Sequence, residues 1–215
     1  MNRNLTEIVF LLDESGSMEP LTADTIGGFN SLLAKQKRQN GRAIVSTILF
    51  SDSSYVIHDR RDIRQVPPLT AADYCPSGCT ALLDAAGGAI HHIETARRYA
   101  RPYDIPGRTL FVITTDGMEN ASTRYSLREV RQMIEKAKKE WHWEFLFLGA
   151  NIDPEETARS MGIDPDWSAR YRPDAEGTAL NFAILGEALC AVREGQPLSR
   201  DWNKAIWDDF QMRKK

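Results

Sequence analysis

The sequence predicts an α/β fold with a doubly wound, mostly parallel central sheet, one antiparallel edge strand, and helices on both faces. Three short runs are apolar at every position: Ile8–Leu12, Leu110–Ile113 and Phe145–Leu148. Such runs are typical of central parallel strands that helices cover on both sides. Between the runs, apolar residues recur at three- and four-residue steps, as they do in amphipathic helices.

Two helices and two helix starts can be located from this pattern. Apolar residues are spaced for one buried helix face over residues 82–93 and again over residues 127–137. Ser126 with Glu129, and Asp153 with Glu156, have the spacing of a capping box. We therefore expect helices to begin directly after Ser126 and Asp153.

One pair of strands interrupts the alternation of strands and helices. Ala43–Phe50 and Tyr55–Ile57 are separated by only residues 51–54. A parallel crossover needs a dozen or more residues, so this pair is predicted to be an antiparallel hairpin. The charged residues 59–62 that follow suit a sheet edge, because charge protects an edge strand from aggregation.

Composition narrows the class of protein. The 215 residues carry 27 Lys and Arg against 30 Asp and Glu, a net charge of −3, which argues against a nucleic-acid or anionic-membrane partner. The apolar runs are far shorter than the roughly 18 residues of a membrane-spanning helix, and no signal-peptide core is present near the start. Three cysteines, Cys75, Cys79 and Cys190, are too few for a disulfide scaffold. These features predict a cytoplasmic protein.

The chain shows no internal repeat or long linker, and we expect one domain over residues 1–197. Residues 198–215 are predicted to form a C-terminal helical extension packed on that domain. Trp202, Ile206 and Phe210 lie one helical turn apart, with Trp207 beside them. Docking on the domain explains this stripe, and a partner-binding helix is the alternative.

Short polar side chains follow the first apolar run. Asp13, Ser15 and Ser17 alternate on a turn that Gly16 permits, and a carboxylate with two hydroxyls suits Mg²⁺ or Mn²⁺ better than a metal that prefers thiolates. By itself this pattern is weak, because a helix cap looks the same. Thr80 precedes a predicted helix and Asp116 follows another apolar run, so both fall at the same edge of the predicted sheet.

These five residues resemble the metal-ion-dependent adhesion site (MIDAS) of von Willebrand factor type A domains. Asp13, Ser15 and Ser17 match the first motif of that family, Thr80 the second and Asp116 the third, and none of the five departs from the pattern. The resemblance covers residues from about 5 to 195. Among members of the family, the chain most resembles small stand-alone bacterial versions, and the segment 148–153 contributes to this resemblance. It implies an intact site in which the three hydroxyls bind Mg²⁺ or Mn²⁺ and the two aspartates act through bound waters.

Such a site implies a protein–protein interaction module. The ligands leave Mg²⁺ poorly neutralised and with at least one water-filled position, where an Asp or Glu of a protein partner would replace the water. No general base is evident, so we expect no enzyme activity. A phosphatase that begins with Asp13 would need a second carboxylate where Ser15 stands, and no G-x-S-x-G elbow or phosphate-binding loop is present.

Two alternatives stay open: a Mg²⁺-dependent hydrolase, and a structural subunit of a larger complex such as an AAA+ ATPase-associated one. Among the flanking residues, Glu14, Glu19 and Glu119 are interpreted as rim positions that shape partner choice. Asp84 is expected at a solvated helix position, with water-mediated support of the metal as the alternative. Cys75 and Cys79 are expected to be reduced, and a disulfide between them is the alternative. Neither the partner nor the oligomeric state follows from the sequence.

Overall fold

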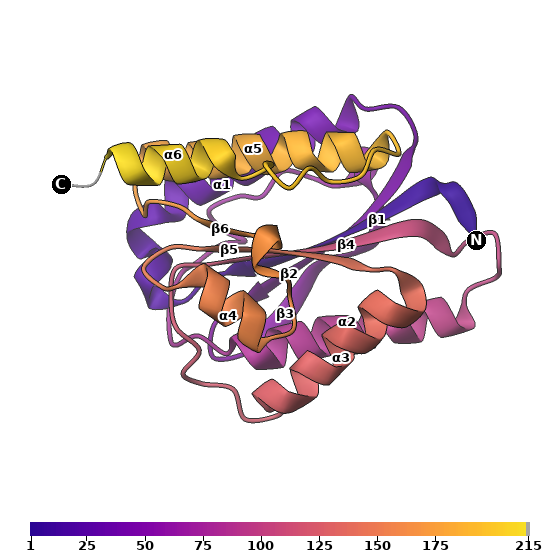
Figure 1. The fold of residues 1–215 in the computed structure, drawn as a ribbon, viewed down its shortest axis with the longest axis horizontal. Helices are drawn as coiled ribbons and strands as arrows, with labels where there is room; N and C mark the ends of the chain where they lie inside the picture. Colours follow the sequence, from indigo (N-terminus) through magenta and orange to yellow (C-terminus); the bar gives the residue numbers. More distant parts are fainter. Residues whose placement is uncertain (214–215) are drawn as a thin grey trace.

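A six-stranded sheet forms the centre of the molecule (Figure 1). The structure is a computed structural model, and it describes residues 1–213. The strand order is β3-β2-β1-β4-β5-β6, and all neighbours are parallel except β2 and β3. The strands are β1 (Asn2–Asp13), β2 (Arg42–Phe50), β3 (Ser54–Asp62), β4 (Pro106–Thr115), β5 (Glu144–Gly149) and β6 (Ser168–Arg170). The predicted fold class is therefore confirmed, including the antiparallel edge strand.

Helices cover both faces of this sheet (Figure 1). One face carries α1 (Thr22–Lys37), α5 (Ala175–Arg193) and α6 (Lys204–Met212). The other carries α2 (Leu82–Tyr99), α3 (Leu127–Trp141) and α4 (Pro154–Ser160). Along β1, Phe10 and Leu12 pack into the first layer while Val9 and Leu11 pack into the second. A strand with both faces buried needs an apolar residue at every position, which explains the continuous apolar runs.

Helices begin after both predicted caps, the first with a complete capping box and the second with a simple N-cap. Ser126 and Glu129 form both hydrogen bonds of a capping box at the start of α3. The Asp153 side chain accepts hydrogen bonds from the backbone N–H groups of Glu155 and Glu156 and so caps α4. His142, with φ of 56°, ends α3 in the left-handed conformation.

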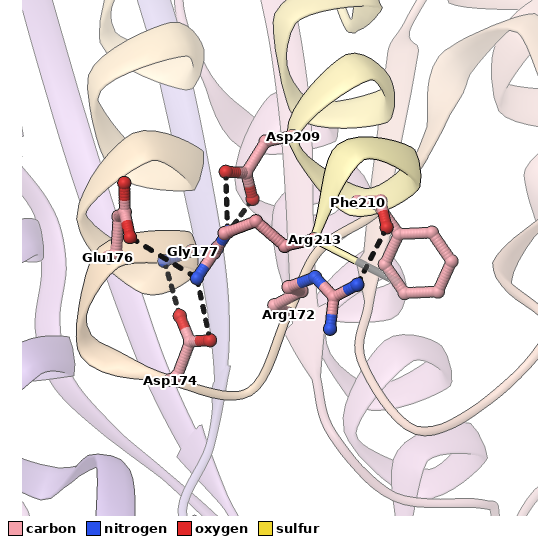
Figure 2. Close-up of polar contacts among 7 residues, drawn as sticks. All are labelled: Arg172, Asp174, Glu176, Gly177, Asp209, Phe210 and Arg213. Carbon is pink, nitrogen blue, oxygen red and sulfur yellow. Dashed lines mark hydrogen bonds and ion pairs between the residues drawn. The ribbon is translucent and has the colours of Figure 1, made fainter. Parts of the chain in front are cut away.

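The C-terminal helix α6 lies against α5 and the edge strand β6 (Figure 1). Ile206 is 1 % exposed and Trp202 8 %, so two members of the predicted stripe are buried in the core. At the far end, Arg213 pairs with Asp174 and Asp209, and the Arg172 guanidinium donates to the carbonyl oxygen of Phe210 (Figure 2). Residues 214 and 215 of the predicted extension lie outside the described residues.

Helix α5 owes its apolar composition to its position between α1 and α6. Within residues 1–213 it is the one helix long and apolar enough to cross a membrane, yet 56 % of its most apolar window is buried inside the fold. A buried core helix accounts for such a composition.

The topology decides where the polar loops meet. The parallel strands β1 and β4 are neighbours, so the loops that follow Asp13 and Thr115 leave the sheet at the same edge. The long connection from β3 to α2 crosses this edge as well and carries Thr80. Three segments distant in sequence are thereby brought together at the carboxyl edge of the sheet.

Candidate metal site at the carboxyl edge of the sheet

Asp13, the last residue of β1, is completely buried, and three hydrogen bonds hold it. Its Oδ1 accepts from the backbone N–H of Ser15 at 2.7 Å, and its Oδ2 accepts from the hydroxyl of Thr115 at 2.5 Å. Its backbone carbonyl accepts from the hydroxyl of the buried Tyr74 at 2.5 Å. The carboxylate therefore has a single fixed orientation before any ion arrives.

The loops after β1 and β4 are joined by side-chain hydroxyls. Ser15 Oγ lies 3.1 Å from Ser17 Oγ, and the Ser17 hydroxyl donates to Asp116 Oδ1 at 2.5 Å. Ser15 is 2 % exposed and Asp116 4 %, whereas Ser17 is exposed. Four of the predicted residues thus form one continuous polar chain that opens to solvent at Ser17.

Thr80 lies beside this chain and is 3 % exposed. A methyl group built on Gly117 would lie 2.9 Å from Thr80 Oγ1 and 3.6 Å from Ser17 Oγ, so the three residues surround one small space. Asn120 fixes Thr80 in place: its Oδ1 accepts from the Thr80 N–H at 2.9 Å, and its own N–H donates to the Thr80 carbonyl at 3.1 Å. The structure therefore brings all five predicted residues together.

The Thr80 loop is also bonded to the first loop through its backbone. The Gly16 N–H donates to the Gly78 carbonyl at 3.0 Å, and the Ser77 N–H donates to the Glu14 carbonyl at 2.8 Å. Gly78 has a φ of +75°, and any side chain there would collide with the carboxylate of Asp52. The positive φ therefore favours glycine at this position.

The site carries negative charge that no side chain in the described part of the chain neutralises. Burial raises the pKa of Asp13 and of Asp116 above the ordinary value, although hydrogen bonds to each carboxylate oppose the shift. Among residues 1–213, none of the ion pairs involves either aspartate. Buried carboxylates are costly without a cation, and these stand among hydroxyl oxygens, a donor set that fits a hard divalent cation.

The described part of the chain contains no cluster of His and Cys ligands of the kind that binds zinc. Residues 1–213 contain no group of three or more His, Cys, Asp or Glu side chains placed to hold a metal ion. Cys75 and Cys79 are exposed and free, so the loop that carries Thr80 is not closed by a disulfide.

Glu119, predicted at the rim, and Asp84, predicted at a solvated position, both hold loops in place instead. The Glu119 carboxylate accepts from the N–H groups of Leu83, Ala121 and Ser122, and so ties the loop after β4 to the start of α2. The Asp84 carboxylate accepts from three consecutive N–H groups at residues 123–125. Although burial opposes ionisation, these donors lower the pKa of Asp84.

Of the other two residues predicted at the rim, Glu19 is exposed and Glu14 is buried. Glu14 is only 4 % exposed and accepts a hydrogen bond from the hydroxyl of Tyr55 at 3.0 Å, so it is not a free rim carboxylate. Glu19 is exposed, as a rim position requires.

Sequence reasoning missed the residues that position Asp13. Thr115 could have been found, because it is a polar residue that ends a buried strand next to Asp116. Tyr74 gave no signal, since an aromatic residue in a long loop has no periodic context and its partner is 61 residues away.

Comparison with models of known protein families gives a match to this chain. The model of the von Willebrand factor type A domain matches residues 7–182, which include all five site residues. The chain belongs to the von Willebrand factor type A domain family. No curated protein sequence matches the chain.

Several solved structures share the fold at low sequence identity. Proximal thread matrix protein 1 from the mussel byssus, described with a zinc-occupied MIDAS motif, is 14 % identical, has a TM-score of 0.60, and aligns over 88 % of this chain and 46 % of its own. The pilus adhesin SpaC from Lactobacillus rhamnosus GG is 12 % identical, with a TM-score of 0.64, over 88 % and 30 %. The vWF domain of the pilus tip protein Mfa5 from Porphyromonas gingivalis is 8 % identical, with a TM-score of 0.59, over 86 % and 94 %. The chain thus spans less than half of the first two proteins.

Proposed function

We propose that this type A domain is a metal-dependent protein-interaction module. In this proposal Ser15, Ser17 and Thr80 hold one Mg²⁺ or Mn²⁺, and Asp13 and Asp116 support it through bound water. The observation that carries the proposal is the pair of buried aspartates, 0 % and 4 % exposed, that lie among three hydroxyl groups and form no ion pair with any cationic side chain of residues 1–213. A divalent cation supplies the missing positive charge.

Neighbouring residues hold the site in position before a ligand binds. Thr115 and Tyr74 orient Asp13, and Asn120 holds the Thr80 backbone. Because these residues are already ordered, little conformational entropy is lost when a ligand binds. Because three of the five side chains are neutral hydroxyls, a bound cation would keep attraction for a further anion. We propose that an Asp or Glu of a protein partner supplies it.

The fold relatives support an adhesive role. A pilus adhesin and a pilus tip protein carry this fold, and the mussel protein is described with a metal in the corresponding motif. Among residues 1–213, no histidine is one of the site residues, and the carboxylates of Asp13 and Asp116 already accept hydrogen bonds. A general base is therefore not provided, and we propose that the domain turns over no substrate.

Metal binding can be tested through stability. A ligand that binds only the folded state raises the melting temperature. We expect Mg²⁺ to raise it for the parent protein and not for the double variant Ser15→Ala, Ser17→Ala. The matched control is Ser31→Ala, Ser53→Ala, since both serines are exposed, and it should respond as the parent does. An equal Mg²⁺ response in all three proteins would show that the ion does not bind at this site.

Partner recognition needs a second experiment. Pull-downs from native lysate with Mg²⁺, with EDTA, and with Thr80→Ala should retain a partner only in the first condition. Because Thr80 is 3 % exposed, its truncation also risks the fold, and Thr80→Ser separates the two effects by restoring the hydroxyl. A partner that is retained in EDTA would show that recognition uses another surface.

A further inference from the structure

The edge strand β6 leaves part of its backbone unpaired. In a parallel ladder, alternate residues direct both N–H and C=O toward the same neighbouring strand. The N–H of Tyr171 donates to the carbonyl of Gly149 on β5 at 3.1 Å, so Ala169, two residues earlier, faces β5 as well. Ser168 and Arg170 must therefore direct their peptide groups away from the sheet.

The side-chain contacts agree with this alternation. The Ser168 carbonyl accepts a hydrogen bond from Asn203 Nδ2 at 2.5 Å, on the outer side of the strand. The Arg170 N–H and C=O have no hydrogen-bond partner among residues 1–213. One donor and one acceptor on the sheet edge thus remain open for pairing.

This open edge forms the floor of a groove of about 430 Å³. The start of α4, at Pro154 and Glu155, forms one wall, and Lys204 and Trp207 of α6 form the other. Figure 1 shows the two helices on opposite faces of the sheet, with β6 between them. An extended peptide is the ligand shape that such a floor and such walls accommodate.

The α6 wall is held at both of its ends. Near its start, Trp202 Nε1 donates to the carbonyl of Asp166 at 2.9 Å, and Ile206 is buried. At its end, Arg213 pairs at 2.8 Å with Asp174, the residue that precedes α5 (Figure 2). The groove is therefore formed before a ligand binds, which reduces the ordering cost of binding.

The two walls differ in chemistry, with the exposed Lys204 beside Trp207 on the α6 side, whereas none of the described α4 residues that line the groove is basic. Trp207 is 45 % exposed, a large apolar surface on the α6 side, while the α4 side presents the exposed carboxylates of Asp153 and Glu155. Successive side chains of a strand point to opposite faces of the sheet. In an added strand, one residue would pack on Trp207 and the next would face Glu155.

We propose that the outer edge of β6 binds an extended segment of a partner protein as an added strand, with an aromatic or large apolar residue next to a lysine or arginine. The apolar residue packs against Trp207, and the basic residue pairs with the acidic wall formed by α4. The segment's backbone pairs with the N–H and C=O of Arg170. This binding does not depend on the metal site.

The test starts with a library of short random peptides selected on the full-length protein in EDTA. Selected peptides should share an aromatic or large apolar residue beside Lys or Arg. Trp207→Ala should weaken their binding about tenfold or more, whereas the matched control Tyr99→Ala, which removes an aromatic residue 82 % exposed elsewhere, should not change it. Glu155→Lys should weaken peptides with a basic residue and tolerate the same peptides with Glu in its place.

Amide hydrogen exchange distinguishes strand addition from simple surface binding. Saturating peptide should slow exchange of the Arg170 amide by about tenfold or more, while the Ala169 amide, already paired with β5, should change little. Three results would overturn the proposal: no enriched sequence, peptides that bind Trp207→Ala equally well, or unchanged exchange at Arg170. A dimer of the chain that Trp207→Ala dissociates would also overturn it, since the edge would then pair with a second copy.

Discussion

Replacing Asp13 by Asn tests the electrostatic reasoning about the metal site most directly. The amide has the shape of the carboxylate: its oxygen can accept from the Ser15 N–H, and its NH₂ group can donate to Thr115 Oγ1. The substitution removes one of two buried negative charges that no cation neutralises. Without metal, Asp13→Asn should therefore be at least as stable as the parent protein.

With metal, the order should reverse. If the proposed site binds Mg²⁺, the ion at about 100 times its dissociation constant should stabilise the parent by about 2.7 kcal/mol. For 215 residues the entropy of unfolding is about 0.45 kcal/mol per kelvin, so the melting temperature should rise by about 6 °C. Asp13→Asn should gain little of this increment, because it lacks the charge that the ion needs.

The assay is thermal unfolding at neutral pH in EDTA and in a Mg²⁺ titration. Asp201→Asn is the control, because it removes an exposed carboxylate and changes the net charge equally. If Asp13→Asn is clearly less stable than the parent in EDTA and still gains the full Mg²⁺ increment, the charge argument is wrong.

Three further predictions concern stability. Gly28→Ala should lower the free energy of unfolding by about 1–3 kcal/mol, because its new methyl group would lie 2.8 Å from Cγ of Phe182. Gly27→Ala has nothing within 4 Å of the new methyl group and should raise this free energy by about 1 kcal/mol. Chemical denaturation of both variants measures the difference. Burial lowers the pKa of His58 below 6.5, so stability should fall as the pH drops through that value, by at most about 1.4 kcal/mol per pH unit for this group, and His58→Gln should remove this slope. Asp84→Ala leaves three backbone N–H groups without their acceptor and should cost about 1–3 kcal/mol in the same denaturation assay, with no cost if water replaces the carboxylate.

The functional consequence of the Glu119 geometry also differs from that of a rim residue. Since this carboxylate joins the loop after β4 to the start of α2, its replacement should disturb the position of Thr80 and lower metal affinity as well as partner affinity. Exposed Glu19 remains the better position for changing partner choice alone, and Glu19→Lys should alter association rate with an unchanged Mg²⁺ response.

The sequence by itself determined the fold class and the position of each chemical motif. Buried parallel strands can be recognised in the sequence because both of their faces must be apolar. The hairpin can be recognised because the four-residue gap before Tyr55 is too short for a parallel crossover. The capping box at Ser126 is equally local, since its two partners lie three residues apart. The grouping of Asp13, Ser15 and Ser17 with Thr80 and Asp116 followed from strand ends and family motifs.

Only the tertiary structure decided which polar side chains serve the site and which hold its loops. Tyr74 reaches Asp13, and Glu119 reaches Leu83, across separations of 61 and 36 residues, and no local pattern encodes such contacts. The groove beside β6 has the same origin: three residues are too few to show a strand period, and its walls come from two helices on opposite faces of the sheet. Local patterns record the spacing within one element, whereas these features depend on how separate elements pack against each other.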